Sequence, residues 1–489
     1  MISDATDPGF EGMQTRVRLT ATCKRLRGML LSRAFETVRF SNDRRISDSA
    51  LLAAQNHGIH IKKLYFLGFD PVLSNSGAPR HAVENRNHIL PYSACLLFAA
   101  ERGLLPNLQT FIIEFDHTQP DPMDFFQSQG IFSGSTQHHS QNLHAPYDFP
   151  ATSLKELWNN TYSALASNST VPHLVINNWT PTIMPRALLE PKWWAYLGRL
   201  QTFELTPADY IGSRNLNTTD PPSLYSSQEA TLWGVRKMDQ FFFDHLCAAR
   251  TIKFSGSKRL LVGSTMYPMG GAMLPLGTLV LKSVVSVELS RVFISSELIQ
   301  FIRRQRDTLR NLVLNDMLAD ALHGGFKVDN PYSIPLLWSR FFHALCGIQG
   351  LVLTNFQVTS ICPLDKQEAR ARIRGDVFPD VDVADEDIDN WFGGVAGDEV
   401  DNYFGDHAPH APDGEDVHRV VSRIKSEIGL AEKEHRDLKL FGYAQLNHKT
   451  RLPRYHPDLN RRRFEDGEDQ AAYEMFMDQL RINQAEVQA

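Results

Sequence analysis

The stretch Leu309-Arg-Asn-Leu-Val-Leu-Asn-Asp-Met317 carries the pattern from which the fold of this chain can be predicted. Apolar residues stand at its first, fourth, sixth and ninth positions, and the central Leu-x-Leu alternation is typical of a short, half-buried strand. The same pattern recurs at residues 61–69, 284–292 and 348–356. Such repetition indicates units that cannot bury their apolar side alone and must stack on their neighbours.

Two further segments carry a variant of this pattern that is one residue longer between its second and third apolar positions. Residues 105–111 and 197–203 share the phrase Leu-x-x-Leu-Gln-Thr-Phe, and weaker echoes lie at residues 153–157 and 249–254. Helical periodicity precedes three of the strands, over the segments 93–101, 296–306 and 334–345. A helix followed by a strand, repeated along the chain, predicts a right-handed parallel α/β coil with its strands on one side.

This arrangement resembles leucine-rich repeats, although the spacing is irregular. Successive strand phrases begin 25 residues apart (284 to 309) and 39 apart (309 to 348), whereas regular leucine-rich repeats span about 20–29 residues and close each phrase with Asn or Cys. We therefore expect an irregular leucine-rich-repeat-like solenoid over residues 41–375. The alternative is a mixed α/β domain without true repeats.

Residues 19–40 combine an amphipathic helix with a following strand. Leu19, Cys23, Leu26 and Leu30 fall on one stripe of a 3.6-residue period, and Phe35, Val38 and Phe40 then change the pattern to an extended one. This segment resembles the last helix of an F-box and the strand after it, as found in fungal F-box proteins with leucine-rich-like repeats. The resemblance implies that Leu19, Cys23, Leu26 and Leu30 contact the Skp-family adaptor of a cullin-based ubiquitin ligase.

The segment before this helix departs from the F-box pattern. Residues 1–18 hold two glycines, a proline and no apolar periodicity, so no stable helix is expected there. A complete F-box would begin with an L-P-x-E-[LI] helix in that place. We therefore expect a disordered N-terminus over residues 1–18 and a partial F-box, truncated at its N-terminal side, over residues 19–40.

Composition and charge favour a folded protein that binds neither nucleic acid nor membrane. Apolar residues make up 42% of the 489 residues, and 29 of them are phenylalanines. Residues 376–416 hold 14 Asp and Glu with no Lys or Arg, and leave only a mild positive balance elsewhere, so nucleic-acid binding is not expected. We expect this acidic segment to be a loop or a disordered insert.

The cysteines and the chain start bear on localisation. No signal peptide and no apolar stretch of membrane-spanning length is visible, so we expect a cytoplasmic or nuclear protein. The five cysteines are widely spaced in apolar surroundings, which predicts reduced thiols in the core. They are Cys23, Cys95, Cys247, Cys346 and Cys362.

The last segment, 417–489, reads as a C-terminal strand and a helical cap. Residues 435–442 look like one more strand phrase. Tyr473, Phe476, Met477 and Leu480 follow the i, i+3, i+4, i+7 spacing of an amphipathic helix. Arg461 to Arg463 form a basic cluster, and we expect the acidic segment 376–416 to balance its positive charge.

No phosphate-binding loop, nucleophile elbow or zinc-ligand spacing occurs in the chain, so we expect no enzyme activity, no cofactor and no metal. The expected function is protein recognition, as a substrate receptor of a Skp/cullin ubiquitin ligase. The alternative is a stand-alone leucine-rich-like scaffold without a ligase role. The protein substrate cannot be identified, but exposed positions of the strand phrases are expected to bind it. They include Lys62, Lys63, Tyr65, Glu288, Arg310, Asn311, Val313 and Gln349.

Overall fold

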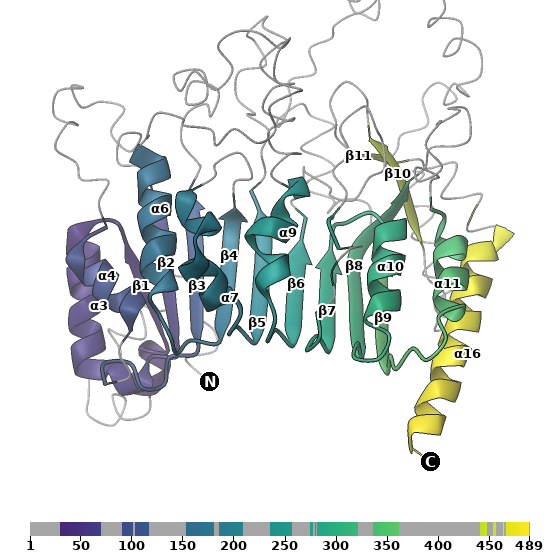
Figure 1. Cartoon of the computed structure of the whole chain (residues 1–489), viewed down its shortest axis with the longest axis horizontal. Coiled ribbons are helices and arrows are strands. Elements are labelled where there is room, and N and C mark those ends of the chain that lie inside the picture. The colour runs from purple at the N-terminus through teal and green to yellow at the C-terminus, as the bar shows by residue number, and fades with distance from the viewer. Residues whose placement is uncertain are drawn as a thin grey trace, which may run out of the picture.

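The computed structural model describes residues 30–69, 90–100, 103–116, 153–179, 185–208, 235–256, 274–276, 279, 281–320, 336–360, 441–446, 453–455, 463 and 466–488. All the named strands belong to one sheet. Nine of them are parallel and lie side by side in chain order (Figure 1). They are β1 (Thr37–Ser41), β2 (Lys63–Phe69), β3 (Thr110–Asp116), β4 (His173–Trp179), β5 (Thr202–Pro207), β6 (Thr251–Ser255), β7 (Ser286–Ser290), β8 (Asn311–Asp320) and β9 (Asn355–Ser360).

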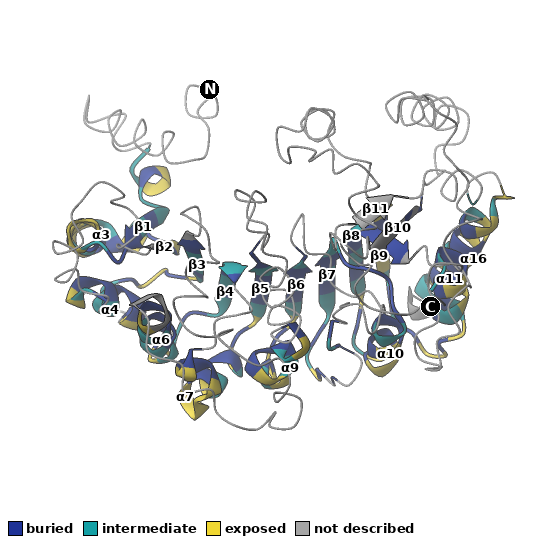
Figure 2. Cartoon of the chain, turned by 90° about the horizontal axis from the view of Figure 1, so that it is seen from above, coloured by how far each residue is buried: buried dark blue, intermediate teal, exposed yellow. Residues whose placement is uncertain are grey.

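Helices line one side of this sheet. Seen from above, the sheet is gently curved, and the described helices between its strands lie on the outer side of the curve (Figure 2). At one end α3 packs beside β1, and at the other α16 packs on α11. The helices are α3 (Arg44–His57), α4 (Tyr92–Ala99), α6 (Ser153–Ala166), α7 (Pro191–Leu197), α9 (Met238–Phe241), α10 (Ser296–Arg304), α11 (Trp338–Cys346) and α16 (Glu468–Gln488). The predicted α/β class and parallel sheet are thus confirmed.

A single register runs through all nine parallel strands. The residues that align at its start are Thr37, Lys63, Thr110, His173, Thr202, Thr251, Ser286, Asn311 and Asn355. We call the aligned residues of the strands the first to fifth rows, counted from these. Connections of very different length keep this register, from 25 residues between Ser286 and Asn311 to 63 between Thr110 and His173. The sheet therefore lacks the constant repeat length of regular leucine-rich repeats.

The second and fourth rows are buried and face the helices. The second row is Val38, Leu64, Phe111, Leu174, Phe203, Ile252, Val287, Leu312 and Phe356, and the fourth is Phe40, Phe66, Ile113, Ile176, Leu205, Phe254, Leu289, Leu314 and Val358. Another buried apolar residue lies three positions before the second row in eight strands. These residues are Ile61, Leu108, Val171, Leu200, Ala249, Val284, Leu309 and Leu353.

This alignment corrects three details of the sequence prediction. The two versions of the pattern are one, because Leu108, rather than Leu105, occupies the place of Leu309. The last phrase was placed five residues too early, since Leu353 and not Ile348 leads into β9. Residues 153–157 belong to α6 and not to a strand.

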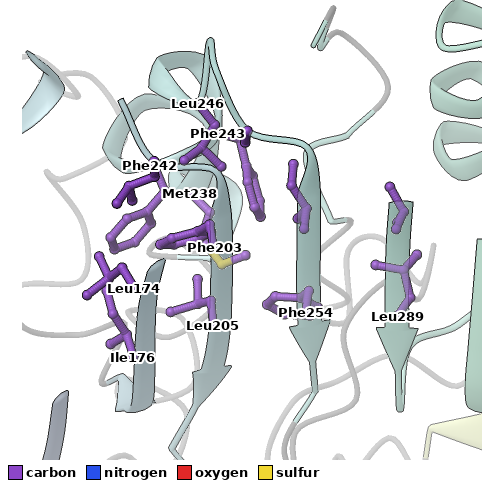
Figure 3. Packing of buried hydrophobic residues seen from close by; sticks show 14 of the residues in the cluster. Leu174, Ile176, Phe203, Leu205, Met238, Phe242, Phe243, Leu246, Phe254 and Leu289 are labelled. Atoms are coloured by element: carbon purple, nitrogen blue, oxygen red, sulfur yellow. The ribbon is translucent and has the colours of Figure 1, made fainter. Parts of the chain in front are cut away.

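Aromatic side chains fill the space between the sheet and the helices. Phe203 of β5 points toward α9 and the 3₁₀ turn η4 (Phe243–His245), where Phe242 and Phe243 meet it (Figure 3). Phe242 is fully buried, and its ring centroid lies 5.5 Å from that of Phe203 and 5.3 Å from that of Trp179. Burial of one such ring contributes about 1.5–3 kcal/mol.

Local signals in the sequence set the helix ends. The hydroxyl of Ser295 caps α10 by accepting a hydrogen bond of 3.3 Å from the amide of Leu298, while Arg303 and Arg304 lie in its last turn, where a positive charge is favourable. The helix predicted over 296–306 is therefore α10, and those predicted over 93–101 and 334–345 are α4 and α11. Asp43 caps α3 in the same way.

The C-terminal end of the sheet is closed by a buried polar network around Asp469 of α16. Its carboxylate accepts hydrogen bonds from the Ser339 amide (2.8 Å), the Tyr443 hydroxyl (2.7 Å) and Arg463 Nη2 (3.2 Å). The Tyr443 hydroxyl in turn accepts from the Trp338 amide at 3.2 Å. Because Leu337 precedes α11 and offers no side-chain cap, residues from β10 (Gly442–Leu446) and α16 cap this helix instead.

The network contains Arg463, which pairs with Glu468 at 2.5 Å and with Asp469. Arg461, Arg462 and the acidic segment 376–416 lie outside the described residues, so the predicted balance between them stays a prediction. The predicted last helix is confirmed as α16, whose Tyr473, Phe476 and Leu480 are buried. The described residues also include β11 (Pro453–Tyr455), which pairs antiparallel with β10, itself parallel to β8.

Several predicted segments lie outside the described residues. They are the N-terminus 1–18, residues 19–29 of the F-box-like segment, the acidic segment 376–416 and residues 417–440 of the C-terminal segment. None of the described helices is long and apolar enough to cross a membrane.

Candidate functional site: the open face of the sheet

The side of the sheet opposite the helices carries the first, third and fifth rows, and we call it the open face. Its third row is Arg39, Tyr65, Ile112, Val175, Glu204, Lys253, Glu288, Val313 and Gln357. The first row is mostly Thr, Ser and Asn, and nearly all residues of both rows are half-buried or exposed. Because strands place successive side chains on opposite faces, the buried second and fourth rows force these polar rows outward.

A polar cluster spans β1 to β4 on this face. The guanidinium carbon of Arg39 lies 4.9 Å from the centroid of the Tyr65 ring, within the range of a cation–π contact. The Tyr65 hydroxyl donates to the Glu114 carboxylate, and Asn178 Nδ2 donates to the same carboxylate at 3.2 Å. Burial raises the pKa of Tyr65, and its bond to Glu114 raises it further, so the hydroxyl stays protonated and donates.

A second polar cluster spans β6 to β9. Lys253 Nζ lies 3.1 Å from Glu288 Oε2, and Asn315 Nδ2 donates to Glu288 Oε1 at 3.2 Å. Thr359 Oγ1 donates to Asn315 Oδ1 at 3.3 Å and accepts from the Asp316 amide at 3.1 Å. Exposed ion pairs of this kind contribute about 0–1 kcal/mol to stability, so their main effect is to fix the positions of charges on the surface.

Three residues with left-handed backbone lie five positions after the first row, within β4 and β8 and directly after β7. Asn178, Arg291 and Asp316 have φ angles of 53°, 54° and 51° and occupy the same place relative to the register of β4, β7 and β8. The next residue in each case, such as Trp179, is buried again, so the left-handed residue ends the alternation of the strand. Arg291 Nε lies 3.8 Å from Asp316 Oδ2 and links two of these positions.

From β3 to β5 the third row is apolar and then acidic. Ile112 pairs with Val175 on the next strand, and Val175 pairs with Glu204. All three are half-buried. Among the described residues, the Glu204 carboxylate has no hydrogen-bond or ion-pair partner.

The predicted partner-binding residues fall into separate groups. Lys63 and Asn311 lie in the first row, and Tyr65, Glu288 and Val313 in the third. Glu288 and Val313 are paired neighbours, but Tyr65 lies five strands from Glu288, about 24 Å away at about 4.8 Å per strand. The remaining three lie outside the strands, before β2, β8 and β9: Lys62, Arg310 and Gln349.

Sequence reasoning missed several residues of the two clusters. Only the pairing of the strands shows where these residues lie on the open face relative to one another. They are Glu114, Asn178, Lys253, Asn315 and Glu204. Alternation identifies outward positions within one strand, but the partner across the sheet depends on loop lengths that vary widely.

Only one of the four residues expected to contact the adaptor is described. Leu30 lies in a helical segment, residues 30–34, that leads through two residues into β1, and it is half-buried. Leu19, Cys23 and Leu26 lie outside the described residues.

The described part of the chain brings together no group of three or more His, Cys, Asp and Glu side chains that could hold a metal ion. Its three cysteines are free thiols, and burial raises the pKa of Cys95 and Cys346, which are half-buried. Cys247 is exposed, so the predicted core position is wrong for this residue. Comparisons of the chain with models of protein families, with curated proteins and with solved structures found no match.

Proposed function

We propose that this protein is a protein-recognition module whose open face binds a substrate protein, and that it acts as the substrate receptor of a Skp/cullin ubiquitin ligase. The observation that carries the recognition role is the open face itself. Nine strands in one register present rows of polar side chains on the side opposite the helices, held in place by cross-strand pairs such as Lys253 with Glu288. Extended faces of this kind suit binding to another protein.

The sheet is, in this proposal, an irregular leucine-rich-repeat-like solenoid. The support is the recurrence of one phrase, an apolar residue followed three and five positions later by two more, at matching places of eight strands. Each unit buries its apolar residues only against its neighbours, as repeat units do. The long connections between strands are insertions into that array.

The ligase role rests on the F-box-like segment 19–40. Leu19, Cys23, Leu26 and Leu30 contact the Skp-family adaptor, and the cullin joins through that adaptor. The helical residues 30–34 support this, since only two residues separate them from the first strand, and they would place an adaptor at the β1 end of the sheet. The protein itself performs no chemistry, because the transfer of ubiquitin belongs to other subunits.

A binding experiment with a purified fungal Skp-family adaptor tests the ligase role. The full chain is expected to retain the adaptor on a column, and Leu26→Asp is expected to weaken binding at least tenfold because it places a charge on the apolar stripe. Leu52→Asp is the matched control, since Leu52 of α3 is 59% exposed and lies outside the stripe. If the full chain does not bind the adaptor, or if both variants bind equally well, the ligase role is wrong and a stand-alone scaffold remains.

A further inference from the structure

The centre of the open face differs from its two ends in how its charges are compensated. At the β1 end, Glu114 is bonded by Tyr65 and Asn178. At the β9 end, Glu288 is bonded by Lys253 and Asn315. The side chain of Glu204 in β5 has no such partner among the described residues.

The nearest cation in the register is already engaged. Lys253 on β6 is the direct neighbour of Glu204, yet its Nζ lies 3.1 Å from Glu288 Oε2. His173, whose strand β4 adjoins β5, does not compensate the charge at pH 7, because burial lowers its pKa and keeps the ring neutral. A half-buried carboxylate is therefore left with its negative charge at the middle of the face.

An apolar strip adjoins this carboxylate. Ile112 and Val175 precede Glu204 in the third row, one on each of the two strands before it. At about 4.8 Å between strands, the strip and the carboxylate together span about 10 Å. That length matches about three residues of an extended peptide.

The balance of charge decides which partner can cover this place. A partner that buried Glu204 under apolar or acidic groups would remove water from an unpaired carboxylate at a cost of several kcal/mol. A partner with an ammonium or guanidinium group here would form a charge-assisted hydrogen bond instead. The same carboxylate thus disfavours partners that place apolar or acidic groups here and favours partners that place a basic group here.

We propose that the centre of the open face binds an extended segment of the substrate protein in which Arg or Lys lies within two residues of an aliphatic side chain. The cation binds Glu204, and the aliphatic side chain packs on Ile112 and Val175. This inference rests on the proposed function as a protein-recognition module and names the chemistry of the segment that it recognises. It does not depend on the ligase role.

The test is a selection of random dodecapeptides on phage against the full-length protein. The selected peptides are expected to be enriched in Arg or Lys next to Val, Ile or Leu. The best peptide, made synthetically, is expected to bind Glu204→Gln about tenfold more weakly and to lose measurable binding to Glu204→Lys. The matched control is Glu156→Lys, a reversal at an exposed residue of α6 on the helical side, which is expected to bind as the wild type does.

Three results would overturn the inference: no enriched peptide, peptides without a basic residue, or equal binding by all four proteins. Thermal melting of each variant shows whether it is folded, and Glu204→Gln keeps the shape of the side chain. The adaptor experiment separates this inference from the ligase role. Loss of adaptor binding with intact peptide selectivity would remove only the ligase, whereas adaptor binding with peptides indifferent to Glu204 would remove only this inference.

Discussion

Replacing Asp469 with alanine should detach the C-terminal end of the protein from α11. Asp469 is 3% exposed, and its carboxylate accepts three hydrogen bonds, from the Ser339 amide, the Tyr443 hydroxyl and Arg463. Loss of a helix cap costs about 1 kcal/mol, and loss of one partner of a buried ion pair costs about 3–5 kcal/mol. We expect a local loss of about 3–5 kcal/mol, because the cap and the ion pair share one carboxylate and their costs do not add in full.

Hydrogen exchange of the α11 amides measures this loss where it occurs. A chain of this length need not unfold in one step, so exchange at α11 separates this local loss from changes elsewhere in the sheet. At about 1.4 kcal/mol for each factor of ten, protection of the Ser339 amide should fall about 100- to 4000-fold. The control is Asp478→Ala in the same helix, where the aspartate is 66% exposed, pairs with Arg481 and should change protection by less than about threefold.

A double variant tests whether the effect comes from the ion pair. In the wild type, Arg463→Met leaves Asp469 buried without its cation, whereas in Asp469→Ala the arginine has already lost that partner. Arg463→Met should therefore cost at least about 1 kcal/mol less in the second background. Two results would refute the role given to Asp469. One is an equal change of protection in Asp469→Ala and Asp478→Ala, and the other is a double variant in which the costs of Asp469→Ala and Arg463→Met simply add.

Three further predictions concern the rest of the fold. Gly58→Ala should lower stability by about 1–3 kcal/mol, because its Cβ would lie 1.9 Å from the carbonyl oxygen of Leu104, while Gly103→Ala, with nothing within 4 Å, should be neutral in thermal melts. Phe242→Ala should cost about 3–5 kcal/mol and Phe242→Leu less than half of that, as measured by the urea midpoint, and equal losses would contradict the packing described. Burial lowers the pKa of His173, so the folded state binds fewer protons than the unfolded state, and stability should fall as pH drops through about 6.5. His173→Gln should make the urea midpoint less dependent on pH between about 7 and 5.5. A pH dependence of the urea midpoint that is the same in the variant as in the wild type would exclude this role of His173.

The sequence was sufficient for the class of fold because the buried rows repeat. Leu312 and Leu314 alternate with outward residues in β8, and the same alternation at Phe203 and Leu205 in β5 predicts strands of one kind. The predicted position of the last strand phrase was wrong because two sets of residues fit the same apolar spacing. Ile348, Leu351 and Leu353 satisfy the apolar pattern as well as Leu353, Phe356 and Val358 do, and only pairing with β8 distinguishes them.

The polar clusters could not be predicted because their members are far apart in the chain. Tyr65 and Glu114 are 49 residues apart, and Ser339 and Asp469 are 130 apart. Alternation within β2 identified Tyr65 as an outward residue, but its partner depends on how β2 and β3 align. No constant repeat length sets that alignment, so it had to come from the structure.

The remote cap of α11 has a consequence for how the protein is made. Ser339 leaves the ribosome 130 residues before Asp469, the residue that caps its helix. At about 5–20 residues per second, synthesis of that interval takes on the order of 10 s. The first turn of α11 lacks the carboxylate of Asp469 for all of this time, and it lacks the hydroxyl of Tyr443 until the last 26 residues of the interval. The β9 end of the sheet therefore remains open while the β1 end can already fold. A ribosome that stalls within this interval would therefore present the cell with a sheet that is folded at one end and open at the other.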